Sequence, residues 1–212
     1  MRTDLQNIQP LTPRVYHYSL DWRFLLPIAD AQKLHVVFEQ DDEFSQALEK
    51  AGIPLSNQHS FSDIRQNDRI NIQSIVLPFG LPARWVSTQQ EDQSEFYRTY
   101  RHLIEPDGHF LVGFNNALYA RSKTKYHAST PRRAISRLRQ AGFKCIKVFG
   151  AMPSLSIPEY IFDLNPQAVQ FALSQRFRRK PVIRRTLKLL ARTIGISRFA
   201  NLLPCYLAVA AA

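Results

Sequence analysis

The chain has 212 residues, of which 45% are hydrophobic and 21% are charged, and its formal net charge is +11. This composition is that of a globular protein and excludes an intrinsically disordered chain. The length suits one domain with a sizeable core, which we expect to extend over residues 1–212. With two cysteines, the chain carries no disulfide framework of the kind found in small secreted proteins.

The charges are distributed unevenly along the chain. Residues 1–100 hold 9 Lys and Arg against 13 Asp and Glu, whereas residues 101–212 hold 19 against 4. No acidic residue follows Asp163. Such asymmetry indicates an anionic partner, which could be nucleic acid, lipid headgroups, a phosphorylated substrate or an acidic protein.

The sequence shows no candidate membrane span, and its first residues show no secretory signal. No apolar run reaches the length that spans a bilayer, and the first residues lack an apolar signal core. We therefore expect a cytoplasmic protein. Residues 1–14 contain two prolines and no periodicity, so we expect an N-terminal arm. The aromatic cluster that follows, around Trp22 and Phe24, is expected to be buried.

Strand and helix patterns alternate through most of the chain. This alternation predicts an α/β, Rossmann-like fold with a mostly parallel sheet flanked by helices. The predicted strands are residues 33–39, 59–64, 72–77, 109–114, 144–149 and 203–212, and the predicted helices are residues 41–53, 89–104, 131–141 and 167–177. A tight turn is predicted at Pro106-Asp107-Gly108, and Cys145 is expected to be buried in its strand.

Residues 176–200 form a basic amphipathic segment, which predicts a C-terminal helical extension. Such a helix can lie on an anionic membrane surface or bind an acidic partner; it can equally pack on the core with its charges in solvent. We do not expect nucleic acid, because aromatic residues are not interleaved with the basic ones. The apolar face comprises Ile183, Leu187, Leu190 and Ile194, and the basic flank comprises Arg184, Arg185, Lys188 and Arg192.

Few residues suggest catalysis by themselves. The six histidines lack a partner at metal-ligand spacing, so we expect no metal site. Neither a P-loop nor a G-x-S-x-G nucleophile motif occurs. Tyr126 and His127 follow a predicted strand end and could overhang a crevice there, with His127 as a general base. The alternative is a solvated loop histidine.

The second half of the chain shows a recognisable order of elements. A predicted helix ends in the turn Leu103-Ile104-Glu105-Pro106-Asp107-Gly108, and a strand that ends in Asn115 follows it. A second helix then starts at Thr130-Pro131 and ends at Ala141-Gly142-Phe143, before another strand. This order resembles the second half of class I S-adenosylmethionine-dependent methyltransferases. The resemblance implies methyl transfer from S-adenosylmethionine to a small-molecule, glycan or peptide acceptor in a biosynthetic pathway. The cofactor contacts it implies are Glu39, Asp63, Pro78 and Phe79; the acceptor contacts are Asn115 and Asn116, beside Tyr126 and His127 as catalytic residues.

The first half departs from the pattern of that family. No glycine precedes Gly52, so the glycine-rich turn that lets a backbone approach the cofactor is missing. We therefore assign residues 33–39 to the family's second strand and predict a truncated N-terminal half. Glu39 and Asp63 can also be read as helix caps or solvated acids. The alternative function is a non-catalytic subunit or binding module, acting through a homo-oligomer, a heterocomplex or an anionic membrane surface to which the chain is peripheral.

Overall fold

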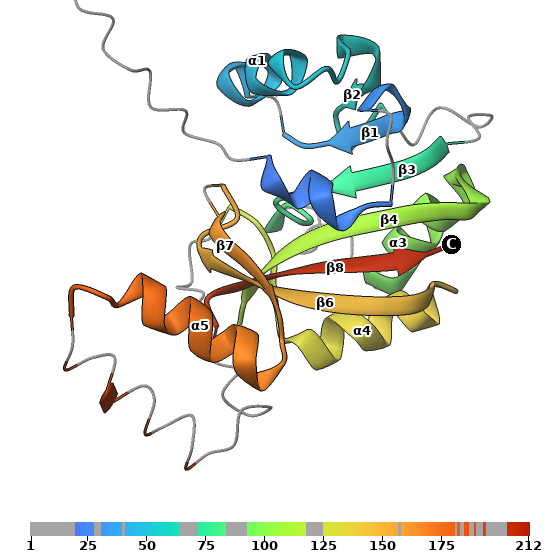
Figure 1. Cartoon of the computed structure of the whole chain (residues 1–212). Coiled ribbons are helices and arrows are strands. Elements are labelled where there is room, and N and C mark those ends of the chain that lie inside the picture. The colour runs from blue at the N-terminus through green and yellow to red at the C-terminus, as the bar shows by residue number, and fades with distance from the viewer. Residues whose placement is uncertain are drawn as a thin grey trace, which may run out of the picture.

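A computed structural model shows a sheet with helices on both faces (Figure 1). It describes residues 20–27, 31–39, 41–63, 72–83, 93–117, 125–156, 158–180, 182, 185, 186, 189, 193 and 203–212. The predicted N-terminal arm and most of the basic segment 176–200 lie outside these residues. Within the described ranges, no helix combines the length and apolar character needed to cross a membrane.

The central sheet has eight strands in the order β2-β1-β3-β4-β8-β6-β7, with the short β5 paired to β4. β2, β1, β3 and β4 are mutually parallel, whereas β8 is antiparallel to both β4 and β6, and β7 is antiparallel to β6. The predicted Rossmann-like class is therefore confirmed. The strands are β1 Leu34–Val37, β2 Gln58–His59, β3 Ile72–Leu77, β4 Ile104–Asn116, β5 Ala128–Ser129, β6 Lys144–Pro153, β7 Pro158–Asp163 and β8 Cys205–Ala211.

The helices divide the core into two clusters, one on each face of the sheet. Helix α1 (Asp42–Lys50) and the 3-10 helix Asp21–Leu25 bury Trp22, Phe44 and Leu48 on one face. The other face is covered by α3 (Gln93–Leu103), α4 (Pro131–Gln140) and α5 (Pro166–Arg176). Short 3-10 helices at Ala31–Lys33 and Leu55–Asn57 flank β1 and β2.

Side-chain caps start three of these helices. The Asp41 carboxylate accepts a hydrogen bond from the Phe44 backbone N–H at the start of α1. Thr130 caps α4 in the same way, and Asn165 caps α5. An N-cap side chain satisfies a helical N–H that has no partner inside the helix, so these starts are encoded locally. The start predicted at Thr130-Pro131 is confirmed.

The order of the strands creates a switch point between β1 and β3. From β1 the chain runs through α1 to β2 on one side, and β3 then lies on the other side of β1. The sequence predicted a truncated N-terminal half, and the structure shows that this truncation leaves no open edge inside the sheet. β1 pairs with β2 and β3 on its two sides, so the described sheet is continuous and its edges are β2 and β7.

Three local predictions differ from the structure. Pro106-Asp107-Gly108 is no turn before a strand: β4 already begins at Ile104, and these residues bulge out between the pairs Ile72–Ile104 and Ser74–His109. Cys145 is exposed, because the register of β6 shifts there and Cys145 has φ of 46°. In the N-terminal aromatic cluster Trp22 is buried, whereas the side chain of Phe24 is 81% exposed.

Candidate functional site

The switch point brings two turns together at the carboxyl edge of the sheet. In doubly wound α/β sheets, ligands bind in the crevice beyond the strand ends at this position. β1 leads through Phe38 and Glu39 to Asp41 and helix α1. β3 leads to Pro78 and Phe79, which were predicted as cofactor contacts. The turn after β1 therefore stands where the fold would hold a cofactor.

The turn after β3 packs directly against β4. A Cβ atom on Gly113 would lie 2.0 Å from the carbonyl oxygen of Pro78. A Cβ atom on Gly80 would lie 2.2 Å from the carbonyl oxygen of Gly113, and Gly80 has φ of +81°. Glycine is required at both positions because a side chain at either would overlap backbone atoms. The close approach fixes the backbone that carries Phe79.

Aromatic side chains fill the crevice between the ends of β1 and β3. The Phe79 ring centroid lies 4.8 Å from that of Phe44 on α1 and 5.5 Å from that of Tyr126. Phe38 packs edge-on against Phe44 with centroids 4.9 Å apart. Phe79 is only 8% exposed. These rings thus pack against one another beside the switch point and belong to the core beneath α1.

Residues 125–127, which we call the cover segment, lie across the end of β3. The His127 backbone N–H donates to the carbonyl of Leu81 at 2.7 Å, and Ala83 donates to the carbonyl of Lys125 at 3.0 Å. The Lys125 Nζ atom lies 3.1 Å from Glu39 Oε2, and the Glu39 side chain is 12% exposed. The predicted cofactor residue Glu39 is therefore paired with the cover segment.

The two predicted catalytic residues of the cover segment have shifted pKa values. Burial raises the pKa of Tyr126, and the nearby carboxylates of Glu39 and Asp41 raise it further. Its phenol is therefore neutral at physiological pH and serves as a poor proton acceptor. Burial lowers the pKa of His127, with a smaller contribution from the positive charge of Arg137. The imidazole is thus neutral at pH 7, the form that can accept a proton.

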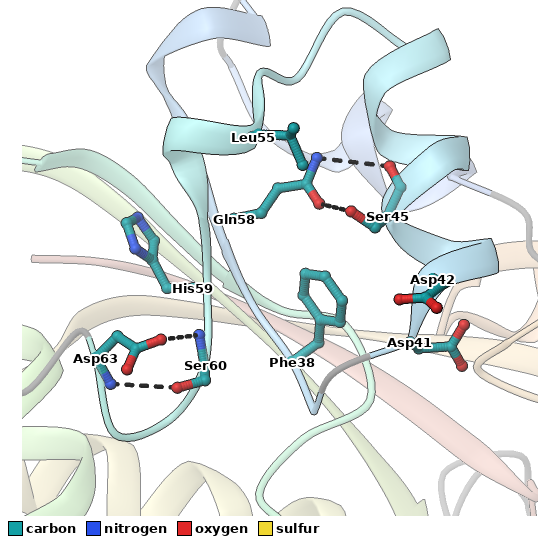
Figure 2. Close-up of a pocket in the computed structure, with 9 residues that line it drawn as sticks. All are labelled: Phe38, Asp41, Asp42, Ser45, Leu55, Gln58, His59, Ser60 and Asp63. Carbon is teal, nitrogen blue, oxygen red and sulfur yellow. Dashed lines mark hydrogen bonds between the residues drawn. The ribbon is translucent and has the colours of Figure 1, made fainter.

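A pocket of about 440 Å³ lies beside the crevice, between the start of α1 and the loop after β2 (Figure 2). Figure 2 shows Asp41 and Asp42 on the α1 side and Asp63 with Ser60 on the opposite loop. Within the described part of the chain its lining includes no Lys or Arg, so we call it the acidic pocket. The Ser60 hydroxyl, and then the Ser60 backbone N–H, hold the pKa of Asp63 below its usual value, so this carboxylate is ionised.

The predicted site residues separate into distinct places. Glu39, Phe79 and Tyr126 meet at the switch point, whereas Asp63 lies in the acidic pocket. Asn116, at the end of β4, is fully buried, and its amide donates to the carbonyl of Leu203 at 2.7 Å and to the Tyr206 hydroxyl at 3.3 Å. Asn115 beside it is half-buried. Among the described residues no group of His, Cys, Asp or Glu side chains is arranged to hold a metal ion.

Sequence reasoning missed the role of Lys125. Its neighbours Tyr126 and His127 were predicted as site residues, but the partner of Lys125 lies 86 positions earlier in the chain, at Glu39. A salt bridge between such distant positions leaves no periodic signal in one sequence. Asp41 and Asp42, by contrast, carry the signal of acidic residues before an amphipathic helix, and that signal locates one wall of the acidic pocket.

No family model and no curated protein matches the sequence. Among solved structures, an S-adenosylmethionine-dependent methyltransferase from Mesorhizobium loti superposes with a TM-score of 0.51 at 12% identity, covering 91% of this chain and 96% of that one. A methyltransferase from Archaeoglobus fulgidus gives 0.48 at 11% identity, covering 84% and 85%. Another from Thermotoga maritima gives 0.48 at 9%, covering 89% and 84%.

The superposition on the Mesorhizobium loti structure and the sheet order define a class I S-adenosylmethionine-dependent methyltransferase-like fold. The predicted resemblance is thereby confirmed at the level of the fold. The protein has the doubly wound sheet of that class, with its antiparallel β8 inserted between β4 and β6.

The residues at the switch point can be tested against S-adenosylmethionine. This molecule joins a nucleoside and a sulfonium to an amino-acid group with a carboxylate, and the usual binding turn offers backbone N–H groups at close approach. In the described sheet β1 pairs directly with β3, so no first strand with its glycine-rich turn stands between them. The turn after β1, which we assign to the family's second strand, presents Phe38, Glu39 and Asp41, and Phe79 packs beside it against Tyr126. The switch point therefore does not fit the amino-acid part, although the acidic pocket suits hydroxyl groups and positive charge.

Proposed function

We propose that the chain is a non-catalytic methyltransferase-like binding module or subunit, which does not use S-adenosylmethionine as a methyl donor. The filled switch point supports this: Phe79 and Tyr126 pack in the crevice, and Glu39 pairs with Lys125 above it. A protein with this role works through a partner. We propose a homo-oligomer, which light scattering of the purified chain detects, or a heterocomplex, which would leave the purified chain monomeric.

The packing of side chains in the crevice disfavours the entry of a ligand. Burying a phenylalanine side chain contributes about 2 kcal/mol, and Phe79 is almost completely buried. The Glu39–Lys125 pair adds little, because the Lys125 side chain is 54% exposed and solvent screens it. A ligand entering the switch point would have to offset mainly the apolar packing of Phe79 against Phe44 and Tyr126.

Methyl transfer is the second candidate, and the acidic pocket favours it. Its volume of about 440 Å³ and its ionised Asp63 suit the nucleoside part of S-adenosylmethionine. In this candidate Glu39 and Asp63 hold the cofactor, and Asn115 with neutral His127 faces a small-molecule, glycan or peptide acceptor. His127 would then accept a proton from the acceptor's hydroxyl or amine.

Isothermal titration with S-adenosylmethionine and S-adenosylhomocysteine distinguishes the two candidates. We expect no binding at millimolar ligand, because the glycine-rich turn that usually receives the amino-acid group is missing between β1 and β3. Micromolar binding by the wild-type chain would overturn the non-catalytic proposal. Methyl transfer would then require that Asp63→Asn weakens binding while Asp107→Asn, at an exposed position far along the sheet, leaves it unchanged.

A cover-segment variant tests the role of the turn itself. Lys125→Ala with Tyr126→Ala removes the side chains that lie over Glu39 and Phe79. We expect no binding by this double variant in the same titration, because the two substitutions do not restore the glycine-rich turn that is missing between β1 and β3. Binding by the double variant alone would contradict the role assigned to the turn and would show that the cover segment blocks an otherwise competent site.

A further inference from the structure

A second pocket, of about 590 Å³, lies between β7 and the end of α5. Its lining includes Tyr160 from β7 and Phe177, which follows α5, together with Arg178, Arg179 and Lys180. Figure 1 shows α5 beside β7 on the side toward which the arrowheads of β1 and β3 point. We call it the basic pocket. None of its residues belongs to the switch point or to the acidic pocket.

The three basic residues are held together by the backbone. The Arg178 N–H donates to the carbonyl of Gln175 at 3.1 Å, and the Lys180 N–H donates to the carbonyl of Phe177 at 2.9 Å. These bonds close a turn immediately after α5, and all three side chains are exposed. Phe177 itself packs against the core. The cations therefore extend from an ordered turn with an anchored aromatic residue beneath it.

The charge in the basic pocket is not neutralised locally. Among the described residues that line it, Glu159 is the one acidic side chain, against the three cations Arg178, Arg179 and Lys180. Within the described part of the chain, none of these three cations forms a salt bridge. No acidic residue follows Asp163 in the sequence. Three like charges at adjacent positions repel one another, and a bound anion would relieve that repulsion.

The basic pocket lies at the carboxyl edge of the sheet. Tyr160 pairs with Met152 near the end of β6, and Ala151 and Asn115 both pair with Cys205 of β8. The carboxyl ends of β4 and β6 therefore lie at the same edge. Ligands of open α/β sheets bind along this edge, so the acidic and basic pockets lie toward its two ends.

We propose that the basic pocket binds a phosphate ester, carried either by a soluble compound or by a lipid headgroup. The planar guanidinium groups of Arg178 and Arg179 match phosphate oxygens in two-pronged hydrogen bonds, and Lys180 adds a point charge. Tyr160 and Phe177 supply apolar walls for the organic part of the ester. This inference does not rest on the proposed function, since it involves neither S-adenosylmethionine nor the switch point.

Titration of the full chain with glycerol 3-phosphate tests the soluble source. Flotation with phosphatidylcholine vesicles, with and without phosphatidylglycerol, tests the lipid source. The variant replaces Arg178, Arg179 and Lys180 by Gln. The matched control replaces Arg132, Arg133 and Arg139 by Gln, three exposed positions on α4, so both variants lose the same charge.

We expect the Arg178/Arg179/Lys180 variant to lose about ten-fold or more in affinity for one of the two probes, and the α4 control to lose less than two-fold. Loss confined to glycerol 3-phosphate assigns a soluble ester. Loss confined to phosphatidylglycerol vesicles, with further loss on Phe171→Ala, assigns a lipid, because Phe171 is 62% exposed on α5. Binding of neither probe, or equal loss in the control variant, would overturn the proposal.

Discussion

Asn116 shows how a residue can look functional in the sequence and be structural in the fold. Its position at the end of a strand predicted an acceptor contact. In the structure its side chain is fully buried, and its amide nitrogen reaches a backbone carbonyl near the start of β8 and the Tyr206 hydroxyl. These bonds join two segments that lie 87 and 90 positions apart in the chain.

We predict that Asn116→Ala lowers the free energy of unfolding by about 1–3 kcal/mol, because it leaves the buried carbonyl of Leu203 without its donor. Urea unfolding followed by circular dichroism measures the loss. Asn115→Ala, at the half-buried neighbouring position, is the control and should cost less. Unchanged stability in Asn116→Ala would contradict the structural role and return Asn116 to the candidate acceptor contacts.

At the residue scale the sequence predicts chemistry only where the signal is local. Asp41 could be recognised as an acid at a helix start, and Thr130 as a cap before Pro131. The pairing of Glu39 with Lys125 and the burial of Asn116 depend on segments far away in the chain. The sequence therefore predicted some residues of the candidate site, but it could not predict which residues they contact.

At the element scale, the histidines of β1 and β2 form an unusual contact at the sheet edge. His35 Nδ1 and His59 Nε2 lie 2.8 Å apart, and the two rings are parallel within 3°. One ring must be the donor and the other the acceptor, so the pair needs at least one neutral imidazole. Burial, and then the charge on His59, lower the pKa of His35 to about 4. Burial also lowers the pKa of His59, partly offset by Asp63.

The pair makes the stability of the chain depend on pH. In the unfolded chain His35 takes up a proton near pH 6.5, whereas the folded chain resists protonation down to about pH 4. The unfolded state thus binds more protons in this window, so stability is greatest above pH 6.5 and falls as the pH decreases toward 4. We predict a corresponding fall in Tm.

Thermal unfolding at several pH values checks this prediction. His35→Phe keeps a ring against His59 but cannot titrate, so its Tm should fall less between pH 7 and pH 4.5 than that of the wild type. His102→Phe, on α3 and away from this pair, is the control. An identical pH profile in wild type and His35→Phe would refute the role of the pair.

Element types were predictable where a pattern repeats over several residues. The periodicity of residues 41–53 and the run at residues 72–77 correspond to α1 and β3. No strand was predicted at β7, because prolines interrupt the sequence around it and its strand conformation depends on pairing with β6. The early start of β4 was missed for a similar reason, since its first residue pairs with Ile72 across a bulge.

At the scale of the whole molecule, the two core clusters are separated by the sheet that they share. β3 contributes Val76 to the cluster beneath α1 and Ile75 to the cluster beneath α3 and α4. Successive residues of a strand point to opposite faces, so every central strand belongs to both cores. Loss of packing on one face therefore removes support from the strands that carry the other. This coupling supports the prediction of a single domain.

We predict one cooperative unfolding transition for the chain. In a Trp85→Phe background, fluorescence reports Trp22 on the α1 face, whereas circular dichroism reports all helices. Leu48→Ala on α1 and Leu138→Ala on α4, both at 0% exposure, should each lower the free energy of unfolding by about 2–5 kcal/mol. Each should shift the midpoints of both signals equally. If Leu138→Ala moved the circular dichroism transition and left that of Trp22 in place, the two faces would unfold separately, and the single domain would have to be divided along the sheet.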